Sequence, residues 1–247
     1  MTRFRPGARS SPRRGAKAGR PRARAPLSRD RVLSTAVSLA DRGGLESLSM
    51  RKLAVALRVE AMSLYHHVAS RDDLLDGMVE RVVSEIEAPE LGVHWKEAMR
   101  RRAISAHAVL RRHPWATALL VSRINVGPAM LHYINATVGC LLQAGFSYAL
   151  TDRAWNALDC HIYGFTLQEQ NFPIEPEDYA SAAQGFLPML SPEKHPYMRE
   201  MAEKVADGSH DGRMDFGFGL ELILDGLERL LGASRSGQRR RQRISPG

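Results

Sequence analysis

The chain has few cysteines, few aromatic residues and no long hydrophobic run. Of its 247 residues, 6% are aromatic and only Cys140 and Cys160 are cysteines. Two cysteines without a recognisable secretory signal indicate buried, reduced thiols rather than a disulfide scaffold. No segment offers the roughly 20 apolar residues that a membrane-spanning helix needs. The composition therefore predicts a cytoplasmic protein without membrane association, long enough for one large or two modest domains.

Motifs that carry catalysis or bind metal ions are also missing. The sequence contains no HExxH, GxSxG or P-loop pattern and no Cys-His ligand spacing. Its central histidines are scattered, which is typical of packed or hydrogen-bonded imidazoles: His107, His113, His132 and His161. An enzyme needs a nucleophile, a base and an orienting group, or a set of metal ligands. We therefore predict no enzymatic activity, no cofactor and no metal site.

The positive net charge lies in the two ends of the chain. Residues 1–27 carry nine basic residues and no acid, and residues 232–247 carry five basic residues and no acid. Subtracting these 14 charges from the net +8 leaves −6 for residues 28–231. Both ends are rich in Gly, Pro, Ser and Ala, which predicts a disordered basic arm at 1–27 and a disordered tail at 232–247. The arm is either a solvated tail or an additional DNA contact.

Helical periodicity recurs along the rest of the chain, and strand patterns are nearly absent. Ser28, Ser49 and Ser70 are good N-caps for a first, second and fourth helix, and residues 61–67 suit a very short third helix. Gly43-Gly44 ends the first helix, and the fourth stops before Pro89. Further helices are expected at residues 94–112, 114–122, 128–144, 152–170, 176–190, 196–206 and 213–231. The sequence predicts an all-α fold.

Two of these helices have little polar surface. Residues 154–170 read AWNALDCHIYGFTLQEQ, and residues 216–231 read FGFGLELILDGLERLL. A helix with so wide an apolar band needs partners on more than one side. This pattern predicts a homodimer whose interface is a four-helix bundle with two helices from each subunit. The alternative is that both are central helices of a monomer.

The second and third helices have the geometry of a helix-turn-helix motif. Ala54 is small enough for the helices to cross closely, and Val59, Leu64 and Val68 can anchor the third helix. The side chains left to face a DNA groove or to flank it are Arg51, Lys52, Ala61, Met62, Ser63, Tyr65, His66, His67 and Arg71. The two adjacent histidines lie about 100° apart on a helix, so they cannot bind one metal ion together. The motif predicts double-stranded DNA as a partner.

The segment LSMRKLAVALRVEAMSLYHHVASRDDLLD closely resembles the DNA-binding segment of the TetR (tetracycline repressor) family. WKEAMRRRAISAHAVLRRHPW, LLQAGFS, GFTLQEQ and FGFGLELILDGLERLL resemble the regulatory domain of the same family, in the same order. The resemblance implies an N-terminal helix-turn-helix domain at 28–74 and a larger C-terminal helical ligand-binding and dimerisation domain at 75–231.

The function implied by this resemblance is ligand-responsive transcriptional regulation. A homodimeric repressor of this family binds a palindromic operator and releases it when a small-molecule inducer moves the fourth helix. The alternative from the residues alone is a helical protein–protein adaptor, or a nucleic-acid-associated protein without an inducer.

The resemblance also implies individual DNA contacts. Arg51, Ser63, Tyr65, His67 and Arg71 match DNA-contacting positions, with Tyr65 and His67 facing phosphates and Arg51 and Ser63 within reach of base edges. Arg58 stands where the family usually has glycine, so a left-handed backbone there would cost about 1 kcal/mol. Ala61 and Met62 replace a Gln-Pro start, which predicts a different operator sequence.

For the ligand site, the resemblance places Glu87, Arg102, Ala106, Thr137 and Gln168 where tetracycline repressors hold their drug. The position of their magnesium-linked histidine falls at Leu119 or Leu120, and Cys160 and Gln168 replace their companion metal-associated residues. Magnesium needs carboxylate, water or ligand oxygens, which this set does not supply. We therefore expect an inducer other than a magnesium–tetracycline chelate.

Arg102 is the most informative of these positions. It shares a helical face with apolar residues, so its guanidinium should point inward and need a partner. One interpretation is an internal carboxylate, or a side chain that reaches the edge of the protein. The other is a carboxylate or enolate of the inducer, held among the aromatic side chains of Trp115, Trp155 and Phe165.

Overall fold

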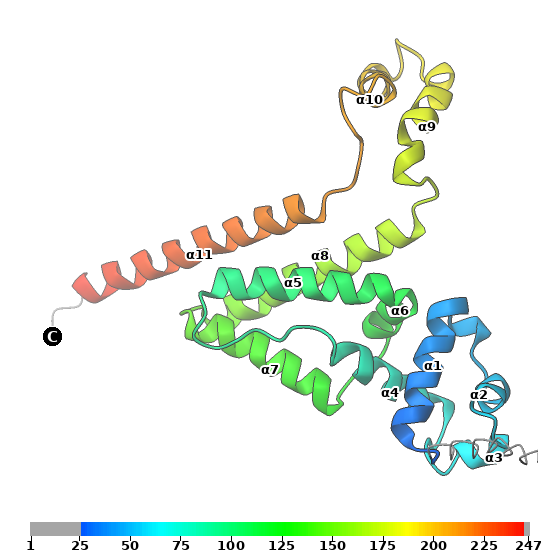
Figure 1. Ribbon diagram of the computed structural model, residues 1–247. Helices are drawn as coiled ribbons and strands as arrows, with labels where there is room; N and C mark the ends of the chain where they lie inside the picture. Colours follow the sequence, from blue (N-terminus) through cyan, green and yellow to red (C-terminus); the bar gives the residue numbers. More distant parts are fainter. Residues whose placement is uncertain (1–25, 245–247) are drawn as a thin grey trace, which may run out of the picture.

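The computed structural model describes residues 26–244, which contain helices and no strands (Figure 1). The predicted all-α fold is confirmed. Residues 1–25 and 245–247 lie outside this range, and with them most of the predicted N-terminal arm.

The N-terminal head consists of α1 (Arg29–Gly43), α2 (Met50–Leu57) and α3 (Ala61–Leu64). The hydroxyls of Ser28 and Ser49 accept hydrogen bonds from the backbone N–H groups of Arg31 and Lys52, as expected of N-caps. The helices enclose a small apolar core of Val32, Ala36, Leu53, Ala54 and Leu64. The third helix ends at Leu64 rather than at residue 67. The next N–H groups bond three residues back, from Tyr65 to Met62 and from His67 to Leu64, which tightens the end of the helix into turns.

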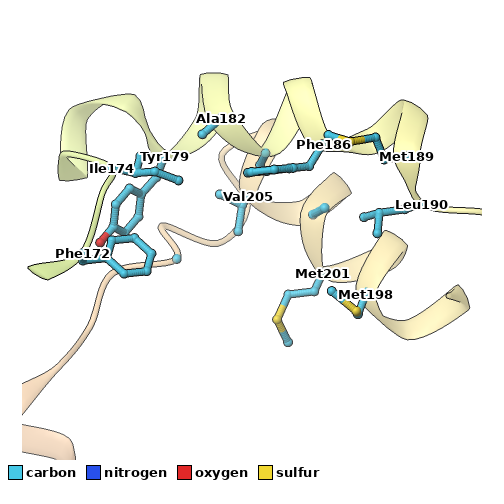
Figure 2. A pocket seen from close by; sticks show the side chains of 13 residues that line it. Phe172, Ile174, Tyr179, Ala182, Phe186, Met189, Leu190, Met198, Met201 and Val205 are labelled. Carbon is cyan, nitrogen blue, oxygen red and sulfur yellow. The ribbon is translucent and has the colours of Figure 1, made fainter. Parts of the chain in front are cut away.

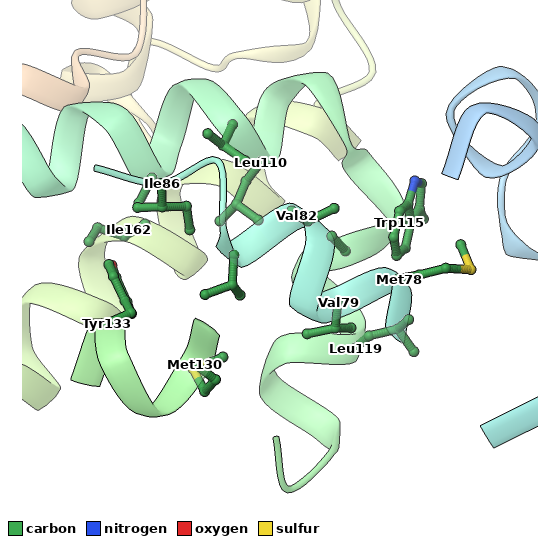
Figure 3. Close-up of a cluster of buried hydrophobic side chains, with 14 of the residues drawn as sticks. Met78, Val79, Val82, Ile86, Leu110, Trp115, Leu119, Met130, Tyr133 and Ile162 are labelled. Carbon is green, nitrogen blue, oxygen red and sulfur yellow. The ribbon is translucent and has the colours of Figure 1, made fainter. Parts of the chain in front are cut away.

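Helix α4 (Arg71–Val83) connects the head to the rest of the molecule. The hydroxyl of Ser70 caps it by accepting from the N–H of Asp73. Its buried side chains, including Met78, Val79 and Val82, pack against side chains of α5 to α8 in one continuous apolar cluster (Figure 3). The boundary expected between residues 74 and 75 thus falls inside a helix that both parts share.

The regulatory part begins with α5 (Trp95–Arg112), α6 (Pro114–Ser122), α7 (Pro128–Gln143) and α8 (Tyr148–Asn171). Helix α8 starts four residues earlier than predicted because Ser147 caps it by accepting from the N–H of Leu150. It contacts α5, α6 and α7 and forms the centre of this part.

Helices α9 (Tyr179–Phe186) and α10 (Pro196–Ala206) form a hairpin that stands away from the body beyond the end of α8 (Figure 1). They enclose an apolar hollow of about 520 Å³ between them (Figure 2). The single helix predicted over 176–190 is wrong. The segment is α9 flanked by two 3-10 turns, Pro176–Asp178 and Leu187–Met189. At the second turn, Pro188 has no N–H group to continue the α-helical hydrogen bonds.

Helix α11 (Phe216–Ile244) packs on α5 and α8 through Leu220, Leu224, Leu227 and Leu231. Its backbone stays helical over residues 232–244, so the prediction that this stretch is disordered was wrong. Arginine and glutamine are good helix formers, and the first proline after Leu231 is Pro246. Extending an existing helix adds one hydrogen bond per residue without a new nucleation step.

Candidate functional site

The exposed surface of α3 and its flanks carries the candidate DNA contacts. Buried Leu64 and Val68 hold the helix, whereas Met62 and Tyr65 are 73% and 46% exposed. The other candidates are exposed or half-buried: Arg51, Lys52, Ala61, Ser63, His66, His67 and Arg71. None of the nine is buried, so the structure leaves all of them accessible. Their contacts with DNA stay predictions.

The turn between α2 and α3 depends on Arg58. Its backbone is left-handed, with φ 57° and ψ 49°, and it is the only non-glycine residue with positive φ in the range from 26 to 244. The N–H groups of Arg58 and Val59 donate to the carbonyls of Val55 and Ala54 at 3.1 and 3.0 Å. This turn brings α3 against α2, and its left-handed backbone costs about 1 kcal/mol, as the sequence predicted.

The end of the α3 segment is tied to α1 and α4 by Arg29. Its guanidinium donates to the carbonyl of His67 at 2.8 Å and to both carboxylate oxygens of Asp73 at 2.6 and 2.9 Å. Asp73 also accepts from the N–H of Ala69, and the hydrogen bonds from Arg29 and Ala69 hold its pKa below the usual value. Sequence reasoning missed Arg29, because its partners lie 38 and 44 residues away and no local pattern joins them.

An inner cavity of about 190 Å³ lies among α6, α7 and α8. Its lining residues are Leu120, Arg123, Asn125, Met130, Tyr133, Ile134, Trp155, Asp159 and Tyr163. Of the expected ligand-site residues, Trp155 and Leu120, the alternative to Leu119, belong to this lining. Arg102, Ala106, Leu119 and Thr137 are buried in the core, and Thr137 donates to the carbonyl of Tyr133. Glu87 and Gln168 are exposed, and Glu87 pairs with Arg101 at 2.5 Å. The expected set is therefore not gathered around one cavity.

The partner of Arg102 in the structure is an internal carboxylate. Its fully buried guanidinium donates to Asp159 Oδ1 at 2.5 Å and lies 4.7 Å from the centroid of the Tyr133 ring. The indole N–H of Trp155 donates to the other oxygen of Asp159 at 2.7 Å. Arg102 Nε and Nη1 and the Tyr133 hydroxyl have no partner. Burial raises the pKa of Tyr133 to about 12, which keeps its hydroxyl a donor.

Polar contacts join the head to α6. His113 and the indole N–H of Trp115 both bond Asp41 Oδ1 of α1, at 2.8 and 2.7 Å. Trp115, expected near the inducer, therefore lies at the contact between the two parts of the chain. Its aromatic character gave no indication of this, because the acceptor lies 74 residues earlier.

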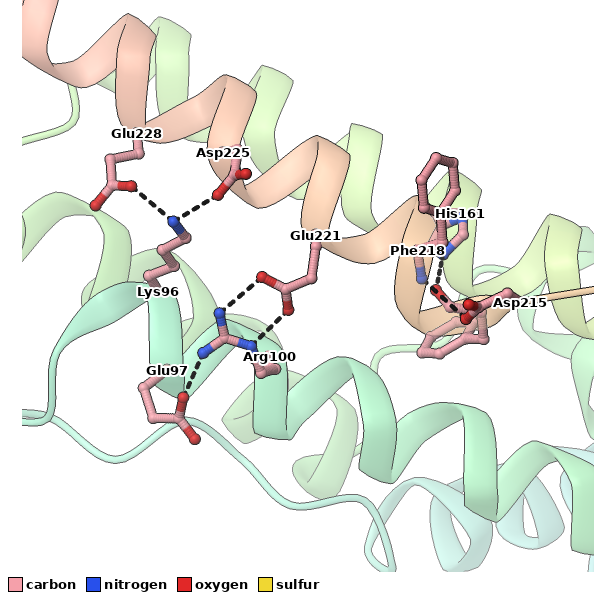
Figure 4. A network of polar contacts seen from close by, with 10 residues as sticks. Lys96, Glu97, Arg100, His161, Asp215, Phe218, Glu221, Asp225 and Glu228 are labelled. Atoms are coloured by element: carbon pink, nitrogen blue, oxygen red, sulfur yellow. Dashed lines mark hydrogen bonds and ion pairs between the residues drawn. The ribbon is translucent and has the colours of Figure 1, made fainter.

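Ion pairs hold α11 on α5 (Figure 4). Lys96 bonds Asp225 and Glu228 at 2.7 and 2.6 Å, and Arg100 makes two bonds to Glu221 at 2.6 and 2.8 Å. At the start of α11, the ring of Phe216 stacks between two imidazoles, with centroid distances of 4.2 Å to His107 and 4.8 Å to His161. These contacts leave Phe218, Leu222 and Leu230 exposed on α11.

The prediction that both cysteine thiols are buried holds for one of the two. Cys140 is buried, but Cys160 is exposed on α8. It lies beside Ala157 and Gly164, which are also exposed, on a side of α8 that the described residues leave uncovered. In the part of the chain that the structure describes, no group of three His, Cys, Asp or Glu side chains could hold a metal ion. No helix in this part has the length and apolarity to cross a membrane.

Two protein families match the chain. "Bacterial regulatory proteins, tetR family" matches residues 32–78, and "Tetracyclin repressor-like, C-terminal domain" matches residues 88–231. The HTH-type transcriptional repressor DrrR1 of Streptomyces coeruleorubidus is 33% identical over 86% of this chain and 81% of its own length. The class D tetracycline repressor protein of Escherichia coli is 29% identical over 82% and 89%, respectively.

Solved structures agree with these sequence matches. The TetR family protein ActR of Streptomyces coelicolor, in complex with actinorhodin, superimposes with a TM-score of 0.70 and 29% identity, over 84% of this chain and 100% of that chain. Its complex with (S)-DNPA gives a TM-score of 0.69 and 28% identity, over 83% and 99%. Because the two family matches span the head and the helical domain in chain order, this chain belongs to the TetR family and is a ligand-responsive, DNA-binding transcriptional regulator.

Proposed function

We propose that this regulator is a cytoplasmic repressor that binds a palindromic operator as a homodimer and releases it when a small-molecule inducer binds. The observation that carries the DNA-binding half is the short helix α3 with the turn after it, which together bury Leu64 and Val68 and expose Met62 and Tyr65. This is the arrangement of a recognition helix that enters the major groove.

The candidate contacts divide by chemistry. Tyr65, His67 and Arg71 bind phosphates and set the register, whereas Arg51 and Ser63 bond base edges. The exposed side chain of Met62 suits contact with a thymine methyl group. Lys52, Ala61 and His66 complete the surface beside them.

Dimerisation rests on α8 and α11. Phe218 and Leu222 are exposed on α11, on either side of the buried Leu220. A second copy of α8 and α11 would bury them in a four-helix bundle, as the apolar patterning predicts. The ion pairs of Lys96 and Arg100 keep α11 on α5 with this face outward.

The inducer binds in the inner cavity. In its lining, the buried Tyr133 hydroxyl and the side-chain amide oxygen of Asn125 have no hydrogen-bond partner. Arg102 lies in the core against the ring of Tyr133, and its Nε and Nη1 are further buried donors without an acceptor. Unpaired buried donors favour a ligand with carboxylate, enolate or carbonyl oxygens. The lining has one carboxylate, that of Asp159, and it is already paired, so a magnesium–tetracycline chelate is a poor fit.

A selection and binding experiment tests this function. The full-length wild-type protein selects DNA from a random duplex pool, and gel shifts measure its affinity for the selected duplex at several salt concentrations. We expect palindromic sequences and an affinity that falls steeply as salt rises, because bound phosphates release counterions. Failure to enrich any sequence at any salt, with a folded dimer, would refute the proposal and favour the adaptor alternative.

A further inference from the structure

The loop of residues 123–127 between α6 and α7 is a thin partition between two hollows. On one side lies the inner cavity, which Arg123 and Asn125 line. On the other side a hollow of about 230 Å³ opens against α4, lined by Asp76, Gly77 and Glu80 of α4 and by residues 124–128. Asn125 lines both. The loop therefore borders the inner cavity on one side and the hollow against α4 on the other.

The beginning of the loop is tied to α4 by Arg123. Its Nε and Nη2 donate to Asp76 Oδ1 at 3.0 and 2.8 Å, and its Nη1 donates to Asp72 at 3.0 Å. The arginine side chain is 25% exposed, and those of Asp72 and Asp76 are 76% and 54% exposed. Ion pairs with such exposed carboxylates are weak, so an anion inside the cavity can compete for the guanidinium.

The end of the loop is tied to α4 by Glu80. Its two carboxylate oxygens accept from the N–H groups of Ala129 and Met130 at 2.7 and 3.1 Å. No N-cap side chain of α7 satisfies these groups, so Glu80 caps the helix from outside and complements its dipole. Gly127 makes the approach possible, since a Cβ atom there would collide with the Glu80 carboxylate. Met130 also lines the inner cavity.

Resting on the proposed function, we propose that Glu80 and Arg123 are the coupling residues that transmit occupancy of the inner cavity to α4. A ligand in the cavity displaces the loop and draws Arg123 away from Asp72 and Asp76. Helix α4 then moves, and the head moves with it. The head follows because Arg29 bonds both Asp73 of α4 and the carbonyl of His67 after α3.

Cutting either tie tests the coupling without a known inducer. The operator affinities of full-length Glu80→Gln, Arg123→Gln and Gly127→Ala are measured by fluorescence anisotropy on the duplex selected by the wild type. Each variant is expected to bind about tenfold more weakly, because a lost cap and a lost ion pair loosen α4 in both subunits. Gly127→Ala keeps an acceptable backbone, with φ −71°, and displaces the side chain of Glu80. The double variant with Glu80→Gln should therefore be no weaker than either single variant.

A filled cavity can be imitated by Ile134→Trp, because Ile134 lines the cavity. We expect this substitution to lower operator affinity in the wild-type background and to have little further effect when Glu80→Gln and Arg123→Gln have already cut both ties. Arg199→Gln is the matched control, since it removes an ion pair with Glu203 in the distant hairpin. Reversing the pair, with Arg123→Asp and Asp76→Arg together, should restore part of the affinity that Arg123→Gln loses.

Hydrogen exchange of the α4 amides supplies a readout that needs no DNA. Exchange should become faster in Glu80→Gln and Arg123→Gln and stay unchanged in Arg199→Gln. If the wild type selects DNA but the variants bind it as tightly or more tightly, or if α4 exchange does not change, the coupling role is overturned. If the wild type selects no DNA, the repressor proposal fails, and the exchange measurement alone decides whether the two ties hold α4.

Discussion

Replacing Asp159 by asparagine keeps the shape of the side chain but removes the carboxylate that pairs with the buried guanidinium of Arg102. The arginine is fully buried, and the side chain of Asp159 is 17% exposed, so solvent screens the remaining charge little. Leaving an unpaired charge inside a protein costs about 3–5 kcal/mol. The amide oxygen can still accept from Nη2, and the Tyr133 ring still lies against the cation. We therefore expect a loss of about 3 kcal/mol per subunit, at the lower end of this range.

Urea unfolding at several protein concentrations measures this loss, because a dimer unfolds with a midpoint that depends on concentration. The double variant Arg102→Met with Asp159→Asn removes both charges and should recover to within about 1 kcal/mol of the wild type. Asp152→Asn, exposed on the same helix, should change stability by less than about 0.5 kcal/mol. If Asp159→Asn lies within about 1 kcal/mol of the wild type, the guanidinium is not paired as described and the reasoning fails.

Three further predictions concern the head and the packing of α11. Arg58→Gly relieves the left-handed backbone at φ 57° and should raise the free energy of unfolding by about 1 kcal/mol; a lower urea midpoint would contradict this. Burial lowers the pKa of His107, so the unfolded chain binds a proton more readily once the pH falls below about 6.5. The free energy of unfolding should therefore fall between pH 7 and 5, and less steeply in His107→Asn; equal slopes would exclude this cause. Tyr65→Phe should weaken binding to selected and random duplexes by about the same factor, roughly threefold to tenfold, because a phosphate contact does not depend on sequence. The control Tyr197→Phe on α10 should change neither affinity. A loss of affinity for the selected duplex alone would show that Tyr65 contacts a base instead.

The helices could be predicted from the sequence where their signals are local. Ser28, Ser49 and Ser70 cap helices because their hydroxyls reach N–H groups three residues away. The prediction of one helix over residues 176–190 was wrong, because it followed the apolar periodicity through Pro188, a residue that ends α-helical hydrogen bonding. The prediction was also wrong over residues 232–244, where low apolar content indicated disorder although the helix continues.

The candidate site could be predicted only in part. All nine candidate DNA contacts are accessible, and they lie at the start of α2, on α3, in the turns after it and at the start of α4. Spacing within each short segment decides which way its side chains face. Of the ligand-site residues that were matched by position along the chain, only Leu120, the alternative to Leu119, lines the inner cavity; Trp155, expected for its aromatic ring, also lines it. Which side chains surround this cavity depends on how α6, α7 and α8 pack, and no local pattern records that packing.

The sequence by itself determined the all-α fold, the helix-turn-helix motif and the apolar faces of α8 and α11, because each follows from residues within a few turns of one another. Only the tertiary structure decided the partners of the charged side chains. Arg102 meets Asp159 across 57 residues, and Arg123 and Glu80 meet groups 47 to 51 residues away. A buried charged side chain pairs with the opposite charge that lies within reach once the helices have packed, so its partner depends on the tertiary structure.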